Sequence, residues 1–371
     1  MNCTLASITL SAAVTLTAAV VHAAAPFLTL DPASLPYATP ADLVPSADYP
    51  VPNAFVTLYF ENDGTFCRPG GTDKHYTSGQ GFSVAAQTSL ARDLGRFIPS
   101  FADRFDPDHP DTSFAAGFIA YQDIYTPSNL FLTIPDPTDR PYAGLLDLGF
   151  FWQRASTPAD SSIATMEHLQ LDLGLIGPAS QADRTQRFIH AHIPTGAVPP
   201  QGWGSQLHDE PGVDLIYLRR YRISLTAAHE MWAVQLIPAA GFTVGTFQRN
   251  VTVEATLRAG WNLPDDFGPG RMHEVGAFTG RQALPRFGAY GFIRGGGIAV
   301  QHNTLLQGND YRRSAGVTAE PLVGEIQAGL AIQFLRHFEL TYSQTLRSED
   351  FRGQQGTDGY GAFVLSFFTT F

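Results

Sequence analysis

Strict alternation of apolar and polar side chains is the feature that most constrains what this chain can fold into. Residues 166–177 read MEHLQLDLGLIG, in which a leucine occupies every second position over most of the segment. A period of two places the leucines on one face of a β-strand and their polar neighbours on the other. The pattern recurs in residues 324–334, GEIQAGLAIQF, and in residues 337–344, HFELTYSQ. The chain is therefore expected to form strands with one apolar and one polar face.

Twelve segments of this kind can be counted. Many of them reach or exceed the roughly 9–11 residues that a tilted strand needs to cross a bilayer. The predicted strands lie near residues 54–61, 78–87, 114–122, 144–154, 165–175, 213–226, 230–242, 251–261, 287–301, 320–334, 336–346 and 360–371. An even number of long amphipathic strands, joined by turns and by loops rich in proline, glycine and aspartate, is typical of a transmembrane barrel.

The end of the chain favours a membrane barrel over a soluble β protein. The last residues read GAFVLSFFTTF, so that Phe363, Leu365, Phe367 and Phe371 share one face. A terminal aromatic residue on an amphipathic last strand resembles the assembly signal of bacterial outer-membrane barrels. A closed antiparallel barrel also pairs every backbone group, as lipid requires. The predicted fold class is all-β, an antiparallel transmembrane β-barrel of about twelve strands, of the Gram-negative outer-membrane type.

The N-terminal segment predicts export. Residues 1–23 carry no charged side chain, run apolar from Leu5 to Val21 and end on a small-residue cleavage pattern, so they are interpreted as a signal peptide. The apolar run is short for a membrane-spanning helix, which needs ~20 residues. The expected organisation is a signal peptide over 1–23, an N-terminal extension over 24–53 and one barrel domain over 54–371.

Charge and cysteine content exclude several classes of function. The formal net charge is −11 and the lysines and arginines form no cluster, which argues against a nucleic-acid partner. Of the two cysteines, Cys3 would leave with the signal peptide and Cys67 would remain alone. An intrachain disulfide and a thiolate metal site are therefore not expected in the mature protein.

A polar stretch at the start of the predicted barrel is the first candidate site. Residues 61–79 read ENDGTFCRPGGTDKHYTSG. Asn62 and Asp63 close the first predicted strand and Thr77 opens the second, so antiparallel pairing would bring them to one rim. Oxygen ligands gathered in this way suit a hard cation such as Ca²⁺. The alternative is an ordinary turn, since Asn-Asp-Gly often follows a strand and His75 would then be a solvated residue or an aromatic-belt neighbour.

A long insertion offers the histidines that such a site would need. Residues 176–212 are too long and too polar for a hairpin turn, and residues 180–193 have a short helical pattern. An insertion of this kind in a barrel is usually functional or a plug. It contains His190 and His192, and either imidazole could act as a general base. No G-x-S-x-G elbow is present.

Several motifs in a fixed order resemble the outer-membrane lipid A 3′-O-deacylase family. They are ENDGTF, TDKHYTSG, QDIYTPS, DRPYAG, GLIGPAS, QRFIH, QGWGSQLHDEP, QGND and RSEDFRGQ, between about residue 61 and residue 354. The similarity covers almost the whole chain after the signal peptide. It implies a barrel of about twelve strands that hydrolyses the ester holding the 3′-acyloxyacyl chain of lipid A, with a requirement for Ca²⁺.

The resemblance also implies roles for individual residues. His190 would be the general base that draws a proton from water, and Asp63 would hold Ca²⁺ near the developing oxyanion. Asn62 and Thr77 would orient water, metal or ester. The implied partner is lipid A or lipopolysaccharide in the outer membrane, and no obligate protein partner is implied.

One loop departs from the family, whose members are thought to hold lipid A phosphate or sugar with a basic pair after D-I-Y-x-P. Here the loop reads SNLFLTIPDPTD and has no basic residue before Arg140. Arg140 is therefore the predicted substrate ligand, with Arg68 and Lys74 as alternatives.

Two other functions remain open at this point. The first is a Ca²⁺-dependent outer-membrane phospholipase with a serine nucleophile, for which Ser78 is the nearest candidate. The second is a non-catalytic barrel, either a channel or a structural protein.

Overall fold

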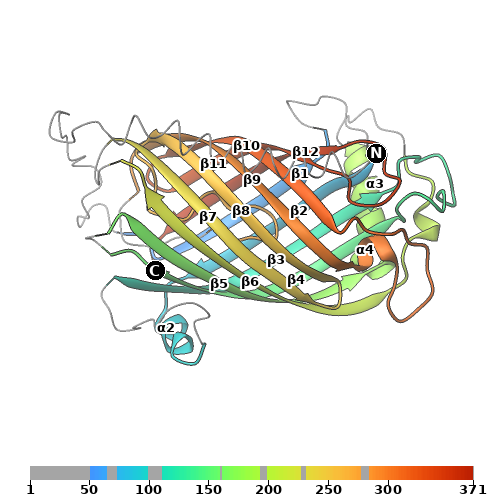
Figure 1. Cartoon of the computed structure of the whole chain (residues 1–371), viewed down its shortest axis with the longest axis horizontal. Helices are drawn as coiled ribbons and strands as arrows, with labels where there is room; N and C mark the ends of the chain where they lie inside the picture. The colour runs from blue at the N-terminus through green and yellow to red at the C-terminus, as the bar shows by residue number, and fades with distance from the viewer. Residues whose placement is uncertain are drawn as a thin grey trace.

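The chain folds into a closed antiparallel barrel of twelve strands (Figure 1). The computed structural model describes residues 51–64, 73–98, 111–158, 161–192, 199–226, 231–276 and 284–370. Each strand pairs with its neighbours in sequence, and β1 closes the barrel on β12. The predicted fold class is confirmed. Residues 1–50, which hold the predicted signal peptide and most of the predicted extension, lie outside the described residues.

All twelve predicted strands are present, with bounds that differ from the predicted ones by a few residues. They are β1 (Ala54–Asn62), β2 (His75–Ala86), β3 (Thr112–Thr126), β4 (Ala143–Ser156), β5 (Ile163–Ile176), β6 (Glu210–Ser224), β7 (Trp232–Gly245), β8 (Gln248–Trp261), β9 (Phe287–Asn303), β10 (Leu322–Phe334), β11 (Phe338–Arg347) and β12 (Asp358–Thr369). The helices described are α2 (Ser89–Gly95), α3 (Ala182–His192) and α4 (Thr304–Gln307), with short 3₁₀ turns η4 (Pro178–Ser180) and η5 (Trp203–Ser205). None of these helices is long and apolar enough to cross a membrane.

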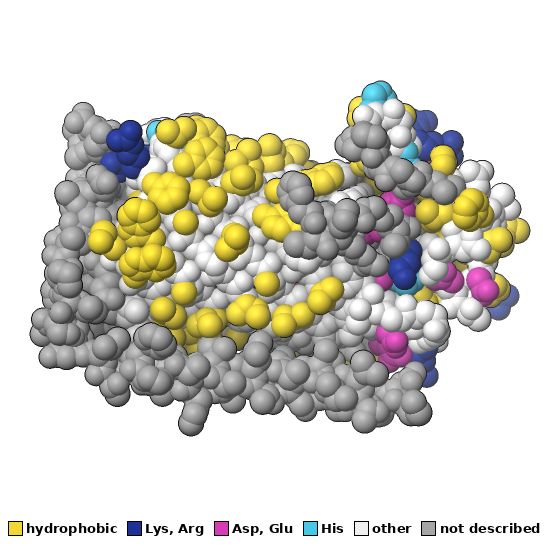
Figure 2. Space-filling view, turned by 90° about the horizontal axis from the view of Figure 1, so that it is seen from above, with side chains coloured by type: hydrophobic (Ala, Val, Ile, Leu, Met, Phe, Trp, Pro, Cys, Tyr) yellow, Lys and Arg dark blue, Asp and Glu magenta, His cyan; other side chains and the backbone are white. Residues whose placement is uncertain are grey.

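The alternation of side chains sets the two surfaces of the wall. In β5, Leu171 and Leu173 point outward and are 43% and 59% exposed, while Gln170 and Asp172 are buried on the lumenal side. Outward apolar side chains gather on the face of the wall seen in Figure 2. An apolar exterior with a polar interior is the arrangement that a lipid bilayer requires of a barrel.

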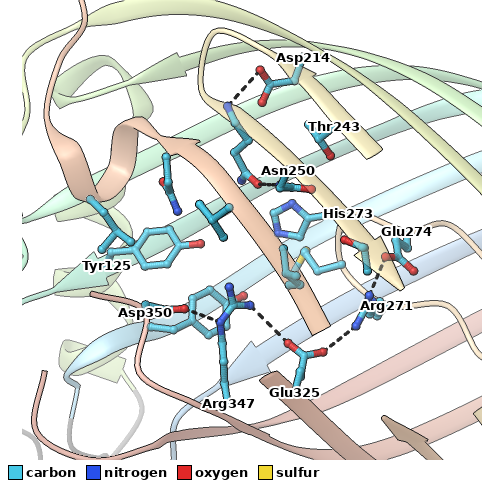
Figure 3. Close-up of a pocket in the computed structure, with 18 of the residues that line it drawn as sticks. Tyr125, Asp214, Thr243, Asn250, Arg271, His273, Glu274, Glu325, Arg347 and Asp350 are labelled. Carbon is cyan, nitrogen blue, oxygen red and sulfur yellow. Dashed lines mark hydrogen bonds and ion pairs between the residues drawn. The ribbon is translucent and has the colours of Figure 1, made fainter. Parts of the chain in front are cut away.

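The lumen is filled by the loop between β8 and β9. Met272 and Val275 of this loop pack against the inward residues Ile119 and Tyr121 of β3. Arg271 of the same loop forms ion pairs with Glu254 of β8 at 3.0 Å and with Glu325 of β10 at 2.7 Å. We call residues 262–276 the lumenal loop. A cavity of about 190 Å³ remains beside it (Figure 3).

Most of the long loops and helices lie at one rim of the barrel, where the odd-numbered strands end (Figure 1). Helices α3 and α4 are at this end, which we call the α3 rim, and α2 lies at the opposite end. The predicted helix within the insertion is confirmed as α3. Residues 176–192 and 199–212 of the insertion do not serve as the plug, because the lumenal loop lies in the interior instead.

Candidate active site

The outer wall changes character below the α3 rim, where polar side chains replace the apolar belt. Phe60 of β1 is 40% exposed and pairs in register with Gln80 of β2, which pairs with Gln122 of β3. Residues directly opposite one another in an antiparallel sheet share a face, so both glutamines point outward. Polar side chains that face lipid without a hydrogen-bond partner cost free energy. This stretch of the wall is therefore expected either to be covered by another part of the chain or to form a functional site.

Helix α3 and the turn before it cover this part of the wall. Gln122 donates a hydrogen bond from Nε2 to the carbonyl oxygen of Ser180. A side chain at Gly144 of β4 would collide with Ala182 and Ser180, since a Cβ there would lie 2.3 Å from both residues. Glycine at this position thus permits the helix to sit directly on the strand. Trp203 holds the next turn by donating from Nε1 to Oε1 of Gln186 at 2.8 Å.

This packing brings His190 against the polar loop that follows β1. Nε2 of His190 lies 3.0 Å from Oδ2 of Asp73. The backbone N–H of Asp73 in turn donates to Oδ2 of Asp63 at 2.7 Å. Asp73 takes up a left-handed backbone conformation, with φ of 47°, and its side chain is buried. A non-glycine residue held in that conformation is uncommon and is often found at functional sites.

Asn62 and Thr77 complete the cluster. Asn62 donates from Nδ2 to the carbonyl oxygen of Thr77 at 3.2 Å, and its Oδ1 accepts from the N–H of Gly64 at 2.7 Å. The pairing of β2 with β3 shifts register between Tyr76 and Ser78, which leaves Thr77 as the extra residue of a bulge. Its hydroxyl lies 2.8 Å from that of Thr126. The bulge turns the Thr77 side chain outward, toward the same polar surface.

The two carboxylates give the cluster a strong negative character. Burial, followed by the nearby charge of Asp63, raises the pKa of Asp73 to about 6, and His190 opposes this shift. Two neighbouring acids of this kind favour a positive partner, which a bound cation would supply.

The donor set fits Ca²⁺ in its chemistry. The oxygens near His190 belong to the carboxylates of Asp63 and Asp73 and to the amide of Asn62, and a hard cation prefers oxygen ligands. Within the residues that the structure describes, no three His, Cys, Asp or Glu side chains form a ready metal cage. Asp63 remains the residue best suited to hold such an ion, and further ligands would come from water or substrate.

Of the five site residues predicted from the sequence, four are gathered in this cluster and one is elsewhere. Asn62, Asp63, Thr77 and His190 lie together on the outer side of the wall. Arg140 is buried in the lumen, where its guanidinium stacks 4.2 Å from the ring centre of Tyr125. It therefore lies on the other side of the wall from the outward polar surface. Its predicted role in substrate binding is untested. Arg68 lies outside the described residues.

The other residues considered from the sequence are His192, Ser78 and His75, and each has a different environment. His192 is exposed, and it is held by its own helix through a contact of 2.9 Å between Nδ1 and the carbonyl oxygen of Phe188. Ser78 is buried, and no histidine in the described ranges hydrogen-bonds to it. His75 was expected to be solvated or an aromatic-belt neighbour, and this was wrong. It is 1% exposed, because its ring is enclosed between β12 and the loop after β3.

Two contributors to the site were not assigned from the sequence. Asp73 lies within the polar stretch 61–79, but its spacing gives no link to His190, which follows more than one hundred residues later. Gln186 lies one turn before His190 on α3 and is 1% exposed. The separation of four residues on a predicted helix is the signal that could have placed it on the same face.

The fold and the wall chemistry define a class. A twelve-stranded barrel with an apolar outer belt and a filled polar lumen is a multi-pass β-barrel of the Gram-negative outer membrane. The chain belongs to the family of outer membrane protein LpxR, whose family model matches residues 13–369.

Solved structures of other outer-membrane barrels are similar to this chain. LpxR from Salmonella typhimurium has a TM-score of 0.61 and 18% sequence identity, and the match covers 85% of this chain and 99% of that chain. The β-domain of the Bordetella autotransporter BrkA has a TM-score of 0.42 and 9% identity, over 86% of this chain and 100% of that chain. No curated protein matches the sequence. The likeness to LpxR from Salmonella establishes a shared fold.

Proposed function

We propose that this protein is an ester hydrolase of the outer membrane that removes the 3′-acyloxyacyl chain of lipid A. The observation that carries the proposal is the contact between His190 and Asp73 on the lipid-facing side of the wall. An outer-membrane barrel places that side within reach of lipids without passage through the lumen. Membership of the LpxR family agrees with a lipid A substrate.

His190 is proposed to be the general base. Because its Nε2 contacts the Asp73 carboxylate, that nitrogen is expected to carry the proton and Nδ1 to carry the lone pair. In the described part of the chain Nδ1 of His190 is buried and has no hydrogen-bond partner. The proposed reaction therefore needs a water molecule to be admitted beside Nδ1 when the substrate binds. This water would give its proton to Nδ1, while Asp73 stabilises the imidazolium that forms.

The proposed reaction proceeds without a covalent acyl-enzyme. The hydroxide formed beside His190 adds to the ester carbonyl carbon and gives a tetrahedral intermediate. This intermediate breaks the bond to the sugar oxygen, which takes the proton back from His190. The products are a free acyloxyacyl acid and a lipid A hydroxyl group. Ca²⁺ held by Asp63 would supply a positive charge for the oxyanion, and Asn62 and Thr77 would orient the reacting groups.

The filled lumen argues against the channel alternative. Residues 262–276 occupy the interior and are fixed by ion pairs to several strands, among them β8 through Glu254 and β10 through Glu325. An open aqueous channel would need this loop to leave. The outer polar surface under α3 has no use in a channel and a direct use in lipid hydrolysis.

Mass spectrometry of lipid A tests the proposal. Outer membranes that contain the wild type, His190→Ala or His192→Ala would be incubated with Ca²⁺ or with a chelator. We expect loss of the acyloxyacyl unit with the wild type and with His192→Ala in the presence of Ca²⁺, and intact lipid A with His190→Ala. His192 is the matched control because it lies on the same helix without contacting Asp73. Intact lipid A in every sample, with folded barrels, would reject this substrate.

A further inference from the structure

A second histidine outside the proposed site makes contacts that the hydrolysis above does not use. Nδ1 of His75 lies 2.8 Å from Oδ1 and 2.9 Å from Oδ2 of Asp358. Its Nε2 lies 2.9 Å from the hydroxyl oxygen of Ser128. A carboxylate on one ring nitrogen and a serine hydroxyl on the other is the arrangement of a serine hydrolase triad. Since triads occur on unrelated folds, they are identified by this geometry and not by their order in the sequence.

The three residues come from separate elements that meet at the α3 rim. His75 opens β2, Ser128 follows β3 and Asp358 opens β12. The histidine and the aspartate are buried, at 1% and 6% exposure, and Ser128 is exposed. A buried acid–base pair that ends at an accessible hydroxyl is what nucleophilic catalysis needs, because the pair must be fixed and the nucleophile must reach its substrate.

The histidine is held in one orientation. The ring of Phe351 meets it edge-on with centroids 5.4 Å apart, and Gln354 donates to Oδ2 of Asp358 at 3.1 Å. His75 also adopts a left-handed backbone conformation, with φ of 61°. A histidine that merely filled space would need neither the unusual backbone nor a hydroxyl partner at the surface.

The same loop indicates what class of substrate could reach the serine. Within six residues of Ser128 it exposes Phe131, Leu132 and Ile134, which are 68%, 40% and 75% exposed. Residues 127–139 contain no lysine or arginine. This surface suits an apolar acyl chain and offers no cation for a phosphate group.

Asn129, next to the serine, is held through its Oδ1 by the N–H of Phe131 at 3.1 Å. Its Nδ2 is the amide nearest in sequence to Ser128 that could donate to an oxyanion.

We propose that Ser128, His75 and Asp358 form a second esterase site with Ser128 as the nucleophile and an acyl ester as the substrate. Oγ of Ser128 attacks the carbonyl carbon while its proton passes to Nε2 of His75. The bond to the alkoxy group breaks, and that oxygen takes the proton from His75. Water then hydrolyses the acyl-serine by the same route and restores the free hydroxyl. Asp358 holds the imidazole and stabilises its charged form.

Asp139 is the other charged group at this site. Its Oδ2 accepts from the N–H of Ser128 at 2.7 Å, and its Oδ1 lies 3.8 Å from Nε2 of His75. It fixes the serine backbone and places a second carboxylate near the imidazole. Because this carboxylate occupies the N–H of Ser128, the oxyanion has to be stabilised by other donors, such as the side chain of Asn129.

A serine-directed covalent probe tests the proposal without knowledge of the natural substrate. The folded, detergent-solubilised barrel would be treated with a long-chain alkyl fluorophosphonate, and the labelled peptide would be identified by mass spectrometry. We expect label on Ser128 in the wild type and none there in Ser128→Ala. His75→Gln should lower the labelling rate at least about 100-fold. Ser162→Ala, which removes an exposed serine elsewhere in the chain, is the matched control. In this variant the probe should label Ser128 at the wild-type rate.

Labelling in His190→Ala separates this inference from the proposed function, because His190 is not part of the triad. Normal labelling of Ser128 in His190→Ala would support two independent sites. An unlabelled Ser128 in a folded wild type would overturn the inference, and so would an unchanged rate in folded His75→Gln. Folding would be checked by heat-modifiable migration on gels. If His75→Gln does not fold, Asn129→Ala replaces it, and we expect at least about tenfold slower labelling.

Discussion

Nε2 of His190 lies 3.0 Å from Oδ2 of Asp73, and this contact joins the helix of the long insertion to the loop that follows the first strand. The two side chains are 9% and 7% exposed. A histidine fixed by a carboxylate has a defined tautomer and a defined free nitrogen, which is what a general base requires. The contact therefore brings together a histidine of the insertion and an aspartate of the loop after β1, and the two residues are proposed to act as one base.

Replacement of Asp73 by asparagine tests whether that unit acts in hydrolysis. The change keeps the size of the side chain but removes the charge that stabilises the imidazolium. We expect the rate of lipid A deacylation to fall by about 10²–10⁴-fold while the barrel still folds. Asp183→Asn on the same helix is the matched control and should retain wild-type activity. Equal rates for Asp73→Asn and the wild type would show that Asp73 does not assist the base.

Substitutions at Thr77 test the bulge in β2. Its hydroxyl lies 2.8 Å from that of Thr126, which itself donates to the carbonyl oxygen of Asp73. Thr77→Val leaves the buried hydroxyl of Thr126 with one partner fewer. This change should destabilise the site by about 1–2 kcal/mol. We expect Thr77→Val to lower deacylation and Thr77→Ser to retain most of it. Rates measured on the same membranes would check this, and a fully active Thr77→Val would assign the hydroxyl a structural role alone.

The strands could be predicted from the sequence because each carries its own signal. The alternation around Leu171 and Asp172 requires only neighbouring residues and a wall with two different solvents. Helix α3 was likewise predictable from local pattern. The position of the lumenal loop could not be predicted from the sequence. Arg271 is held there by Glu254 and Glu325, and these acids come from two other strands of the barrel.

The candidate site shows the same limit. Asn62, Asp63 and Thr77 flank one hairpin, so antiparallel pairing alone predicts that they meet. The partners of His190 and His75 depend on contacts between distant segments, which no local pattern contains. Arg140 is the first basic residue after an apolar loop, and it lies inward, stacked on Tyr125; its role in substrate binding stays a prediction. Position in a loop does not determine which side of a thin wall a side chain will occupy.

Removal of Arg271 tests whether the lumenal loop closes the barrel. Its guanidinium contacts Glu274 of the same loop at 2.6 Å and Glu325 at 2.7 Å (Figure 3). It also contacts Glu254 at 3.0 Å. Arg271→Ala removes the cation that these acids share, but Glu274 keeps Arg220 at 2.8 Å and Glu325 keeps Arg347 at 3.3 Å. The expected cost is therefore below the about 3–5 kcal/mol of a buried charge left without any partner. We expect larger and more frequent conductance steps in planar lipid bilayers than with the wild type.

An exposed arginine supplies the control for this measurement. Arg312 lies in the loop after α4, on the surface, and Arg312→Ala should leave the conductance unchanged. If Arg271→Ala conducts no better than Arg312→Ala, packing of Met272 and Val275 is sufficient to keep the loop in place. If the wild type is already open, the lumenal loop does not close the barrel.

His273 makes the attachment of the lumenal loop dependent on pH. Its Nε2 lies 3.0 Å from Oδ2 of Asp123, and its ring packs 4.3 Å from that of Tyr121. Burial disfavours the charged imidazole, but Asp123, Glu61 and Asp147 outweigh this and raise the pKa of His273 from 6.5 to about 9. The charged histidine thus stabilises the folded protein fully below its ordinary pKa, and this contribution is lost as the pH rises through about 9.

The expected change is on the order of 2 kcal/mol, since the side chain is 30% exposed and solvent screens part of the interaction. Thermal unfolding of the detergent-solubilised barrel at about pH 6 and about pH 10 would measure it. The wild type should lose more stability over this interval than His273→Gln, which has no proton to lose at that position. Other groups titrate in both proteins and cancel in the comparison. Equal losses would mean that the ion pair with Asp123 does not fasten the loop.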